Sequence, residues 1–354
     1  MTDFEREKHI QYFLSNLRML PSPYTETETN RMTLAYFCLG GLELLGALET
    51  VVSDHNKKDW IEWIYAQQIL PSEDGKNDPH CGFRGAPWSG ECFTPNKTIS
   101  EYHYYDSSHI ANTYTALLNL LLLGDDLSRV NRKAIVNTIR CLQQEDGSIA
   151  PTFDSLERDV RFIFCAAAIS YILNDWSGLN IERTVEHIKS LQSYEYSIGQ
   201  CPGEEAHGGS TFCGVAALTL MGKQDEGLLD KDQMVKWCLD RQSTGFQGRP
   251  NKQPDTCYCF WIGASLKMLN AFQWINHENL RGFLMTTQTK MGGFGKDDKS
   301  FPDVLHSYMG IATLSLLGEP GLRTMDEAVN LPTTGMERLK QNCVFWNASQ
   351  DTSL

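Results

Sequence analysis

The sequence predicts an all-α protein built from repeated pairs of helices. A glutamine recurs near the end of successive amphipathic segments, with a period of roughly fifty residues, at Gln68, Gln144, Gln192, Gln242 and Gln288. A glycine-containing loop and then an apolar segment rich in small residues follow. No repeat shows the alternation of polar and apolar residues that marks a strand. The pairs would either stack into a linear superhelix or close into an α-α barrel with the apolar helices inside.

The expected elements follow in order along the chain. Residues 3–20 have helical periodicity that ends at Pro21, and a second helix is expected over residues 27–48. The repeats follow and include apolar helices over 213–222 and 309–318. We expect one domain over 1–354, divided into N-terminal helices (1–50), helix-pair repeats (51–320) and a C-terminal extension (321–354). The extension is polar after Leu331, so we expect it to be irregular.

Composition argues against several classes of protein. The chain has 354 residues and a net charge of −13, whereas nucleic-acid binders normally present a basic face. Its most apolar run, residues 116–124, is too short to span a bilayer, so no integral membrane protein is expected. The first residues lack the basic-then-apolar layout of a signal peptide. The eleven cysteines are scattered without a dense framework, which predicts reduced thiols and a cytoplasmic location.

The segment Gly248–Trp261 joins a loop to a helix and concentrates reactive side chains. Two prolines disfavour helix before Asp255, because proline lacks an amide donor and restricts the residue before it. Asp255 is a good N-cap, and residues 256–268 are expected to form an apolar helix. Asp255 and Cys257 share the first turn, where both could ligate a metal. A lone pair of this kind is more often a helix cap and a core thiol.

His306 changes that balance because it lies one repeat later, near the start of another apolar helix. Asp, Cys and His would supply three ligands and leave a fourth position open, the pattern of a catalytic zinc site. Asp303 is then either an N-cap or a group that supports the ligands. Aligning the repeats places five polar residues in one column near the N-termini of apolar helices: His109, Asp159, His207, Asp255 and Asp303.

Cations gather near the same helix N-termini in an otherwise acidic chain. His207, Arg249 and Lys252 flank two of them, and Tyr258 offers a phenol donor close by. Side chains of these types are commonly solvated surface groups. Clustered at helix N-termini, they favour binding of an anion such as a diphosphate.

Three motifs together resemble the β subunits of protein prenyltransferases: Gly248–Trp261, Glu205–Gly214 and Pro302–His306. The resemblance extends over nearly the whole chain and implies an α-α barrel, the α6-α6 toroid. It also implies one Zn²⁺ per β subunit. The implied zinc ligands are Asp255, Cys257 and His306, and the implied diphosphate-binding residues are His207, Arg249, Lys252 and Tyr258. Arg161 matches an arginine near the isoprenoid and peptide cavity.

Three further positions resemble the branch of this family that transfers geranylgeranyl. Thr33 stands where the farnesyl-transferring branch carries a bulky Trp, and its small side chain makes room for one more isoprene unit. Phe37, on the same expected helix, is a candidate for the cavity wall. Leu305 precedes the implied His ligand, where the farnesyl branch has Tyr. Lys296 occupies the place of an aspartate that holds magnesium in that branch, so Mg²⁺ is not expected to be required.

The resemblance implies transfer of geranylgeranyl from its diphosphate to the cysteine thiol of C-terminal CaaX sequences, with Leu or Phe at X, in small GTPases and similar proteins. The catalytic residues would be the three zinc ligands with Tyr258 and Lys252. The catalytic unit would be a heterodimer with a helical-repeat α subunit. A farnesyl-transferring β subunit and a non-catalytic barrel scaffold are the alternatives. Terpene cyclases share such barrels, but the sequence lacks the Asp-x-Asp-Asp motif that they need.

Overall fold

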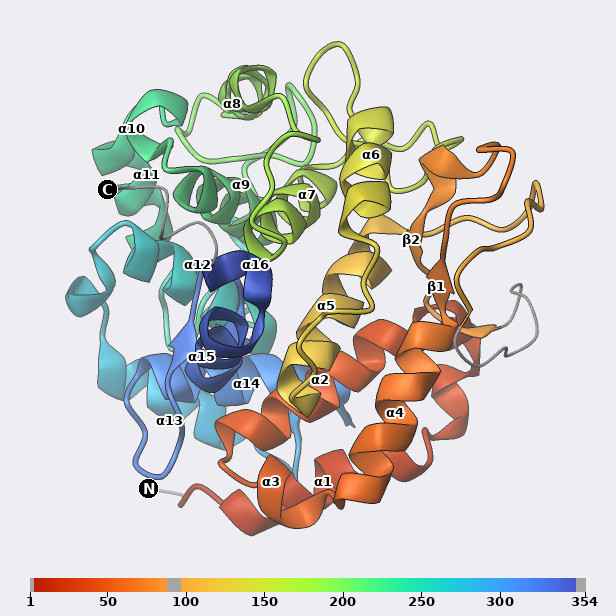
Figure 1. Ribbon diagram of the computed structural model, residues 1–354. Helices are drawn as coiled ribbons and strands as arrows, with labels where there is room; N and C mark the ends of the chain where they lie inside the picture. Colours follow the sequence, from red (N-terminus) through yellow and green to blue (C-terminus); the bar gives the residue numbers. More distant parts are fainter. Residues whose placement is uncertain (1–2, 88–96, 348–354) are drawn as a thin grey trace. The chain divides into compact units, whose positions relative to one another are not determined.

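The computed structural model describes residues 3–87 and 97–347, and two sets of helices alternate along it (Figure 1). The amphipathic set comprises α1 (Arg6–Arg18), α4 (Asp54–Ala66), α6 (Arg132–Leu142), α8 (Ile181–Ser190), α11 (Lys231–Leu239) and α13 (His277–Thr287). The apolar set comprises α2 (Arg31–Leu44), α5 (Ile110–Leu123), α7 (Val160–Ile172), α9 (Gly208–Met221), α12 (Thr256–Met268) and α14 (Val304–Leu316). The prediction of an all-α protein made of repeated helix pairs is confirmed.

Short elements join these helices. They include the helices α3 (Leu48–Val51) and α10 (Gln224–Gly227) and the 3₁₀ helices η1 (Ser22–Asn30), η2 (Asp78–His80) and η4 (Phe272–Trp274). Among the described residues, three antiparallel pairs of two-residue strands also form: β1 (Gln68–Ile69) with β2 (Gly82–Phe83), β3 (Phe294–Gly295) with β4 (Pro302–Asp303), and β5 (Met325–Asp326) with β6 (Leu331–Pro332). Periodicity cannot reveal strands this short, because two residues contain no alternation to recognise.

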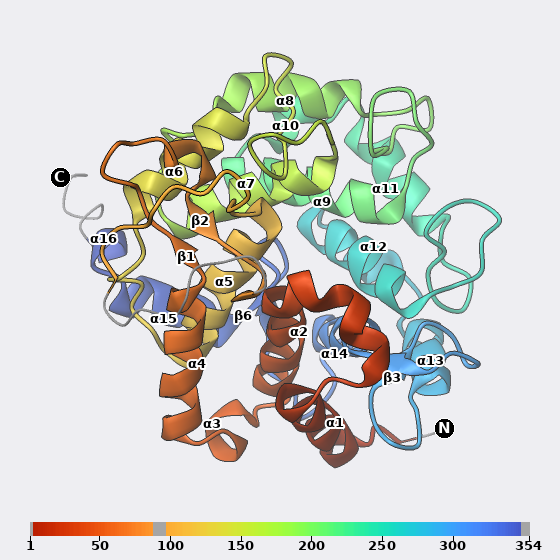
Figure 2. The ribbon, with the colours of Figure 1, turned by 90° about the vertical axis from the view of Figure 1, so that its right-hand side faces the viewer.

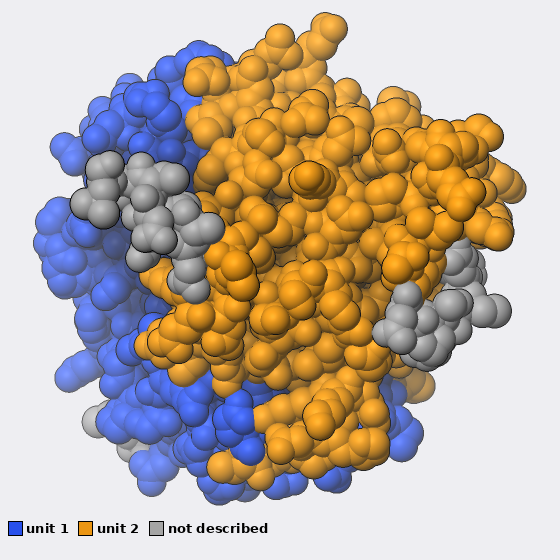
Figure 3. All heavy atoms as spheres, in the orientation of Figure 1, with its two compact units in different colours: residues 1–20, 37–49, 185–333 blue, residues 21–36, 50–184, 334–354 orange. Residues whose placement is uncertain are grey.

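The chain falls into two compact units, coloured separately in Figure 3. Unit 1 comprises Met1–Leu20, Phe37–Glu49 and Val185–Thr333, and unit 2 comprises Pro21–Tyr36, Thr50–Thr184 and Thr334–Leu354. In unit 1, α12 packs against both α9 and α14 (Figure 2). In unit 2, α5 packs against α7 and α4. Both cores therefore consist mainly of the apolar helices, as their composition predicts.

Five of the apolar helices begin at a polar side chain that accepts a hydrogen bond from a backbone N–H of the first turn. These N-caps are His109, Asp159, His207, Asp255 and Asp303. They are the column that the repeat alignment predicts. The first amides of a helix have no partner within the helix, so a capping side chain is needed where the helix start is buried.

The recurrent glutamine has one repeated structural role. After five of the amphipathic helices its side chain binds the backbone that leads into another amphipathic helix, donating from Nε2 and accepting at Oε1. Gln143 bonds in this way to the carbonyl and the amide of Asn180, at 3.1 and 2.8 Å. Equivalent pairs of bonds are made by Gln68, Gln192, Gln242 and Gln288. In the second repeat the residue is Gln143 and not the predicted Gln144, whose Nε2 donates to Leu142.

The prediction of an irregular C-terminal extension is wrong for residues 333–347. Two helices form there, α15 (Thr333–Asn342) and α16 (Val344–Asn347). Met336 and Leu339 lie one turn apart and are both buried, so α15 has an apolar face that the polar composition concealed. The Trp346 indole donates to the carbonyl of Ile172 at 2.8 Å. Residues 348–354 of the predicted irregular tail lie outside the described residues.

Near the N-terminus the helices are shorter than predicted. The first spans Arg6–Arg18, and the second begins at Arg31 because Ser22–Asn30 forms a 3₁₀ segment. The predicted helix over 256–268 has those bounds. Within the ranges that the structure describes, no helix has both the length and the apolar character needed to cross a bilayer.

Candidate metal centre

Three potential metal ligands converge where α12 and α14 begin. Asp255 caps α12, Cys257 lies on its first turn, and His306 lies on the first turn of α14. One donor atom from each residue lies within 4.8 Å of the others. Asp255 is 5% exposed and Cys257 is 9% exposed, so water has little access to either side chain. A carboxylate oxygen, a thiolate sulfur and an imidazole nitrogen are all donors that zinc accepts, and three of them suit a catalytic site with one open position.

Helix capping fixes the orientation of these ligands. Oδ1 of Asp255 accepts the Cys257 amide at 2.8 Å, which ties the two ligands of α12 together. Asp303 caps α14 by accepting the His306 amide at 2.9 Å, and its Oδ2 lies 2.6 Å from Nδ1 of His306. That contact turns Nε2 of His306 toward Asp255, with 3.3 Å between Nε2 and Oδ1. A carboxylate behind a histidine ligand is the usual support of a metal centre.

Electrostatics at this cluster favour positive charge. Burial alone would lower the pKa of His306, but hydrogen bonds with two carboxylates and the Cys257 thiol outweigh it and raise the pKa to about 12. Burial raises the pKa of the Cys257 thiol to about 12, with Asp255 acting in the same direction and His306 opposing. A cluster that stabilises positive charge has the property required of a cation site.

A lysine on the loop after β3 extends toward the cluster. The Lys296 ammonium lies 3.9 Å from Oδ2 of Asp255 and is more than half exposed. Its backbone is held by α12. The Thr256 amide donates to the Lys296 carbonyl at 3.0 Å, and the Thr256 hydroxyl donates to the Gly295 carbonyl at 2.7 Å. The structure thus places Lys296 beside Asp255, one of the three potential ligands. Thr256 was not predicted, because a threonine at the first position of a helix is unremarkable in a sequence.

Two of the predicted anion-binding residues meet beside the cluster. Nδ1 of His207 accepts the Gly209 amide at 3.2 Å, so Nε2 carries the proton and donates to the Tyr258 hydroxyl at 2.7 Å. The phenol O–H is then oriented to donate to a further acceptor. Gly248 is required beneath the ring, because a Cβ there would lie 2.3 Å from Cζ of Tyr258. The Gly248 carbonyl also accepts the Gly208 amide at 2.9 Å.

The other two predicted cations lie on the loop before α12. The Arg249 guanidinium pairs with Glu205 at 3.2 Å, and both side chains are about half exposed. Lys252 is exposed on the same loop, and its amide donates to the Arg249 carbonyl at 3.3 Å. Neither guanidinium nor ammonium is locked in a buried pair, which leaves both able to bind an incoming anion.

The residues predicted to line the cavity are divided between the units. In unit 2, the Thr33 hydroxyl lies 3.2 Å from Oδ1 of Asn112 and 3.3 Å from the Thr115 hydroxyl. Arg161, also in unit 2, bonds to Oδ2 of Asp159 at 2.9 Å. In unit 1, the Phe37 ring packs against Tyr308 with 5.7 Å between centroids.

The comparisons with known proteins identify the family. The family model described as the prenyltransferase alpha-alpha toroid domain matches residues 4–331. The geranylgeranyl transferase type-1 subunit beta of Dictyostelium discoideum is 41% identical, covering 92% of this chain and 94% of the relative. The protein of the same name from Arabidopsis thaliana is 39% identical over 93% of this chain and 89% of the relative. The chain belongs to the geranylgeranyltransferase type I β-subunit family.

A solved structure shows the same fold for this prenyltransferase family. The Candida albicans protein geranylgeranyltransferase-I complexed with GGPP superposes with a TM-score of 0.86, at 24% identity, covering 96% of this chain and 99% of that chain. The predicted α-α toroid is therefore confirmed as the fold class. The chain is a prenyltransferase subunit, as the sequence predicts.

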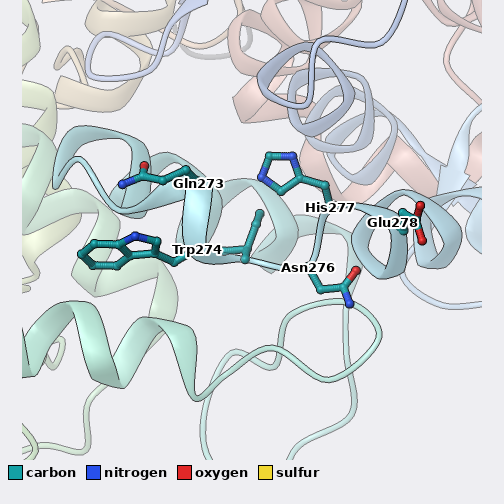
Figure 4. Close-up of a pocket in the computed structure, with 6 residues that line it drawn as sticks. Gln273, Trp274, Asn276, His277 and Glu278 are labelled. Carbon is teal, nitrogen blue, oxygen red and sulfur yellow. The ribbon is translucent and has the colours of Figure 1, made fainter.

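A surface hollow elsewhere in this prenyltransferase subunit is separate from the metal centre. It lies between α12 and α13 and is lined by Gln273, Trp274, Ile275, Asn276, His277 and Glu278 (Figure 4). It lies beyond the C-terminal end of α12, whereas Asp255 caps the N-terminal end. The intervening helix is about 20 Å long at 1.5 Å per residue. The hollow is thus no part of the candidate site.

Proposed function

We propose that this chain is the catalytic β subunit of a zinc-dependent enzyme that transfers geranylgeranyl from geranylgeranyl diphosphate to the cysteine of C-terminal CaaX sequences with Leu or Phe at X. The observation that carries the proposal is the convergence of Asp255, Cys257 and His306, with the His207–Tyr258 pair and Lys296 alongside. Membership of a family of geranylgeranyl-transferring subunits gives that geometry its chemical meaning.

Asp255, Cys257 and His306 would hold the zinc ion. Bound zinc supplies a positive charge that keeps a coordinated thiol deprotonated at neutral pH, and the thiolate is the nucleophilic form of cysteine. The surrounding residues prepare this site. Asp303 fixes the imidazole of His306, and the Asp255–Cys257 hydrogen bond fixes the first turn of α12.

The diphosphate leaving group would be stabilised by His207, Arg249, Lys252, Tyr258 and Lys296. Negative charge grows on the diphosphate as the allylic C–O bond breaks, so donors aimed at it stabilise the transition state more than the ground state. Tyr258 is suited to this role because its oxygen accepts a hydrogen bond from His207, which leaves its own O–H to donate. The ammonium of Lys296 would take the place of a magnesium ion, so we propose that Mg²⁺ is not required.

The length of the isoprenoid would be selected by the residues that the family resemblance assigns to the isoprenoid cavity. The small Thr33 side chain leaves room for a fourth isoprene unit, Phe37 would contribute to the apolar wall, and Arg161 would lie near the isoprenoid and the peptide. Holding the isoprenoid extended in one position brings its first carbon to the sulfur of the substrate cysteine. The entropy lost when the two reactants meet is then no longer part of the activation barrier.

We propose that the partner is a prenyltransferase α subunit and that small GTPases are the protein substrates. The net charge of −13 gives no reason to expect nucleic acid as a partner. Scattered cysteines suit a reducing compartment, so the proposed location is the cytoplasm.

A transfer assay on the heterodimer tests the proposal. Geranylgeranyl and farnesyl diphosphates would each be offered with peptides ending in Leu or Ser, with and without magnesium. We expect transfer of geranylgeranyl to the Leu peptide that is independent of magnesium. Farnesyl transfer to the Ser peptide as the main activity would contradict the isoprenoid and CaaX proposals, and an intact heterodimer without transfer would favour a scaffold.

Thr33 provides the matched pair of variants for this assay. Thr33→Trp fills the proposed cavity and should shift the ratio of kcat/KM values toward farnesyl diphosphate by at least tenfold, whereas Thr33→Ser should leave the ratio unchanged. A tenfold change corresponds to about 1.4 kcal/mol of differential transition-state binding. An unaltered ratio in Thr33→Trp would remove Thr33 from the selectivity site.

A further inference from the structure

We propose that His9, on the N-terminal helix α1, is a positioning residue of the metal centre. It fastens the Gly293–Lys296 segment, and that segment holds the N-termini of α12 and α14, which carry the ligands. The inference rests on the proposed metal site, and His9 itself is distant from the ligands in sequence.

The surroundings of His9 fix one tautomer of its ring. His9 is fully buried, and its ring is stacked between Phe4 and Phe294, at centroid distances of 5.1 and 4.6 Å. The Gly293 amide donates to Nδ1 at 3.0 Å, so this nitrogen must carry no proton. Nε2 therefore carries the proton and donates to Oε1 of Gln288 at 2.9 Å. Burial lowers the pKa of His9 to about 4, which keeps the ring neutral near physiological pH.

The glycine loop is shaped to receive α1. Gly292 and Gly293 both have positive φ, +87° and +77°, which favours glycine over other residues. A Cβ on Gly292 would lie 2.2 Å from the backbone carbonyl of Lys8, so α1 packs directly on the loop backbone. His9 is thus the side chain by which α1 fixes the position of Gly293.

The next three residues connect Gly293 to both ligand-bearing helices. Phe294 pairs with Asp303, the cap that orients His306 on α14. The carbonyls of Gly295 and Lys296 accept the hydroxyl and the amide of Thr256, which lies between Asp255 and Cys257 on α12. One extended segment therefore spans the two helix starts, and a shift of Gly293 is transmitted to the ligands on both sides.

Two substitutions separate the two hydrogen bonds of His9. In His9→Asn, Oδ1 is as many bonds from Cβ as Nδ1 is, so the bond from Gly293 is kept and the bond to Gln288 is lost. In His9→Gln, Nε2 can replace the imidazole donor to Gln288, but the amide oxygen Oε1 lies one bond farther from Cβ than Nδ1, so the acceptor for the Gly293 amide is displaced. Both variants lose the ring stacking and should lower the melting temperature by similar amounts. Only His9→Gln releases the loop.

The test uses the full-length chain in its heterodimer and measures zinc affinity by competition with a chelator. His9→Gln should weaken zinc binding by about tenfold, the size of effect found when supporting partners of metal ligands are removed. His9→Asn should stay within about twofold of wild type. Gln143→Leu, which removes an equivalent glutamine contact in unit 2, should lower the melting temperature without changing zinc affinity.

Hydrogen exchange of the metal-free protein gives a readout that does not depend on zinc. The amides of residues 255–257 and 293–296 should exchange faster in His9→Gln than in His9→Asn. Equal exchange rates or equal zinc affinities in the two variants would overturn the inference. If the wild-type heterodimer bound no zinc, the proposed function would fail, and the exchange rates would still decide whether His9 positions the two helix starts.

Discussion

At the scale of single residues, the sequence predicted the three potential ligands and the supporting Asp303, but it missed His9 and Thr256. Asp255, Cys257 and His306 were predictable because each occupies the start of a repeated apolar helix, a position that a repeat alignment reveals. His9 was not, since its partner Gly293 lies 284 residues away and no local pattern marks a buried histidine on an amphipathic helix. Thr256 was missed for the same reason, because its partners belong to another repeat.

The hydrogen bond between His207 and Tyr258 yields a prediction at this scale. Tyr258→Phe keeps the ring that packs beside Gly248 but removes the O–H proposed to bind the diphosphate. We expect kcat to fall by about tenfold, the effect of losing one hydrogen bond of roughly 1.5 kcal/mol, with little change in melting temperature. Steady-state kinetics of the heterodimer would measure it.

Tyr65→Phe is the matched control for Tyr258→Phe. Its phenol donates to Asp125 at 2.6 Å, and both residues belong to unit 2, whereas the potential metal ligands belong to unit 1. We expect this variant to lose some stability and to keep its kcat. Equal kcat values in the wild type and Tyr258→Phe would exclude the phenol from diphosphate stabilisation.

At the scale of elements, the sequence predicted the repeated helix pairs but not the hydrogen bonds that connect one repeat to another. Periodicity gave the alternation of amphipathic and apolar helices, but the glutamine contacts join one repeat to the backbone of another. In the C-terminal extension the sequence failed to predict the helix itself, because the segment is polar on average. Met336 and Leu339 suffice to bury one face of α15, and a composition average does not detect two residues.

The glutamine contacts predict a stability effect that a neighbouring residue lacks. Gln143→Leu leaves the carbonyl and amide of Asn180 without their side-chain partner and should reduce the free energy of unfolding by about 1–2 kcal/mol, since each such bond contributes about 1 kcal/mol. Gln144→Leu removes only a bond to Leu142, two residues away. Denaturant unfolding of both variants checks this, and equal losses would contradict the assigned role.

At the scale of the whole molecule, the fold class followed from the period of the repeats and from the absence of strand alternation. The choice between an open superhelix and a closed ring did not follow from periodicity alone. It required comparison with the toroid family, because both arrangements repeat the same helix pair.

Acid stability is a property of the whole molecule to which His9 makes a defined contribution. Its folded pKa of about 4 lies below the ordinary value of 6.5, so the unfolded chain binds the proton first. The associated stability is fully present above pH 6.5 and is lost as the pH falls toward 4, by at most about 3 kcal/mol. Glu5 is the nearby charge that opposes the shift.

His9→Asn cannot titrate and should lose less stability than the wild type over that range. Measuring the free energy of unfolding of both proteins between pH 7 and 4 isolates the difference, since all other titrating groups are shared. Parallel curves would show that the burial of neutral His9 does not govern this part of the acid response.

The metal content of the purified heterodimer tests the central claim most directly. Cys259 is the control for Cys257, because it is a fully buried thiol on the same helix whose Sγ contacts the Asp255 carbonyl at 3.4 Å. We predict one zinc per heterodimer in the wild type and in Cys259→Ser, and loss of zinc in Cys257→Ser. Cobalt substitution should show a thiolate charge-transfer band in the first two proteins alone. A wild-type heterodimer without metal, or a Cys257→Ser variant with full zinc occupancy and an unchanged cobalt spectrum, would contradict the account.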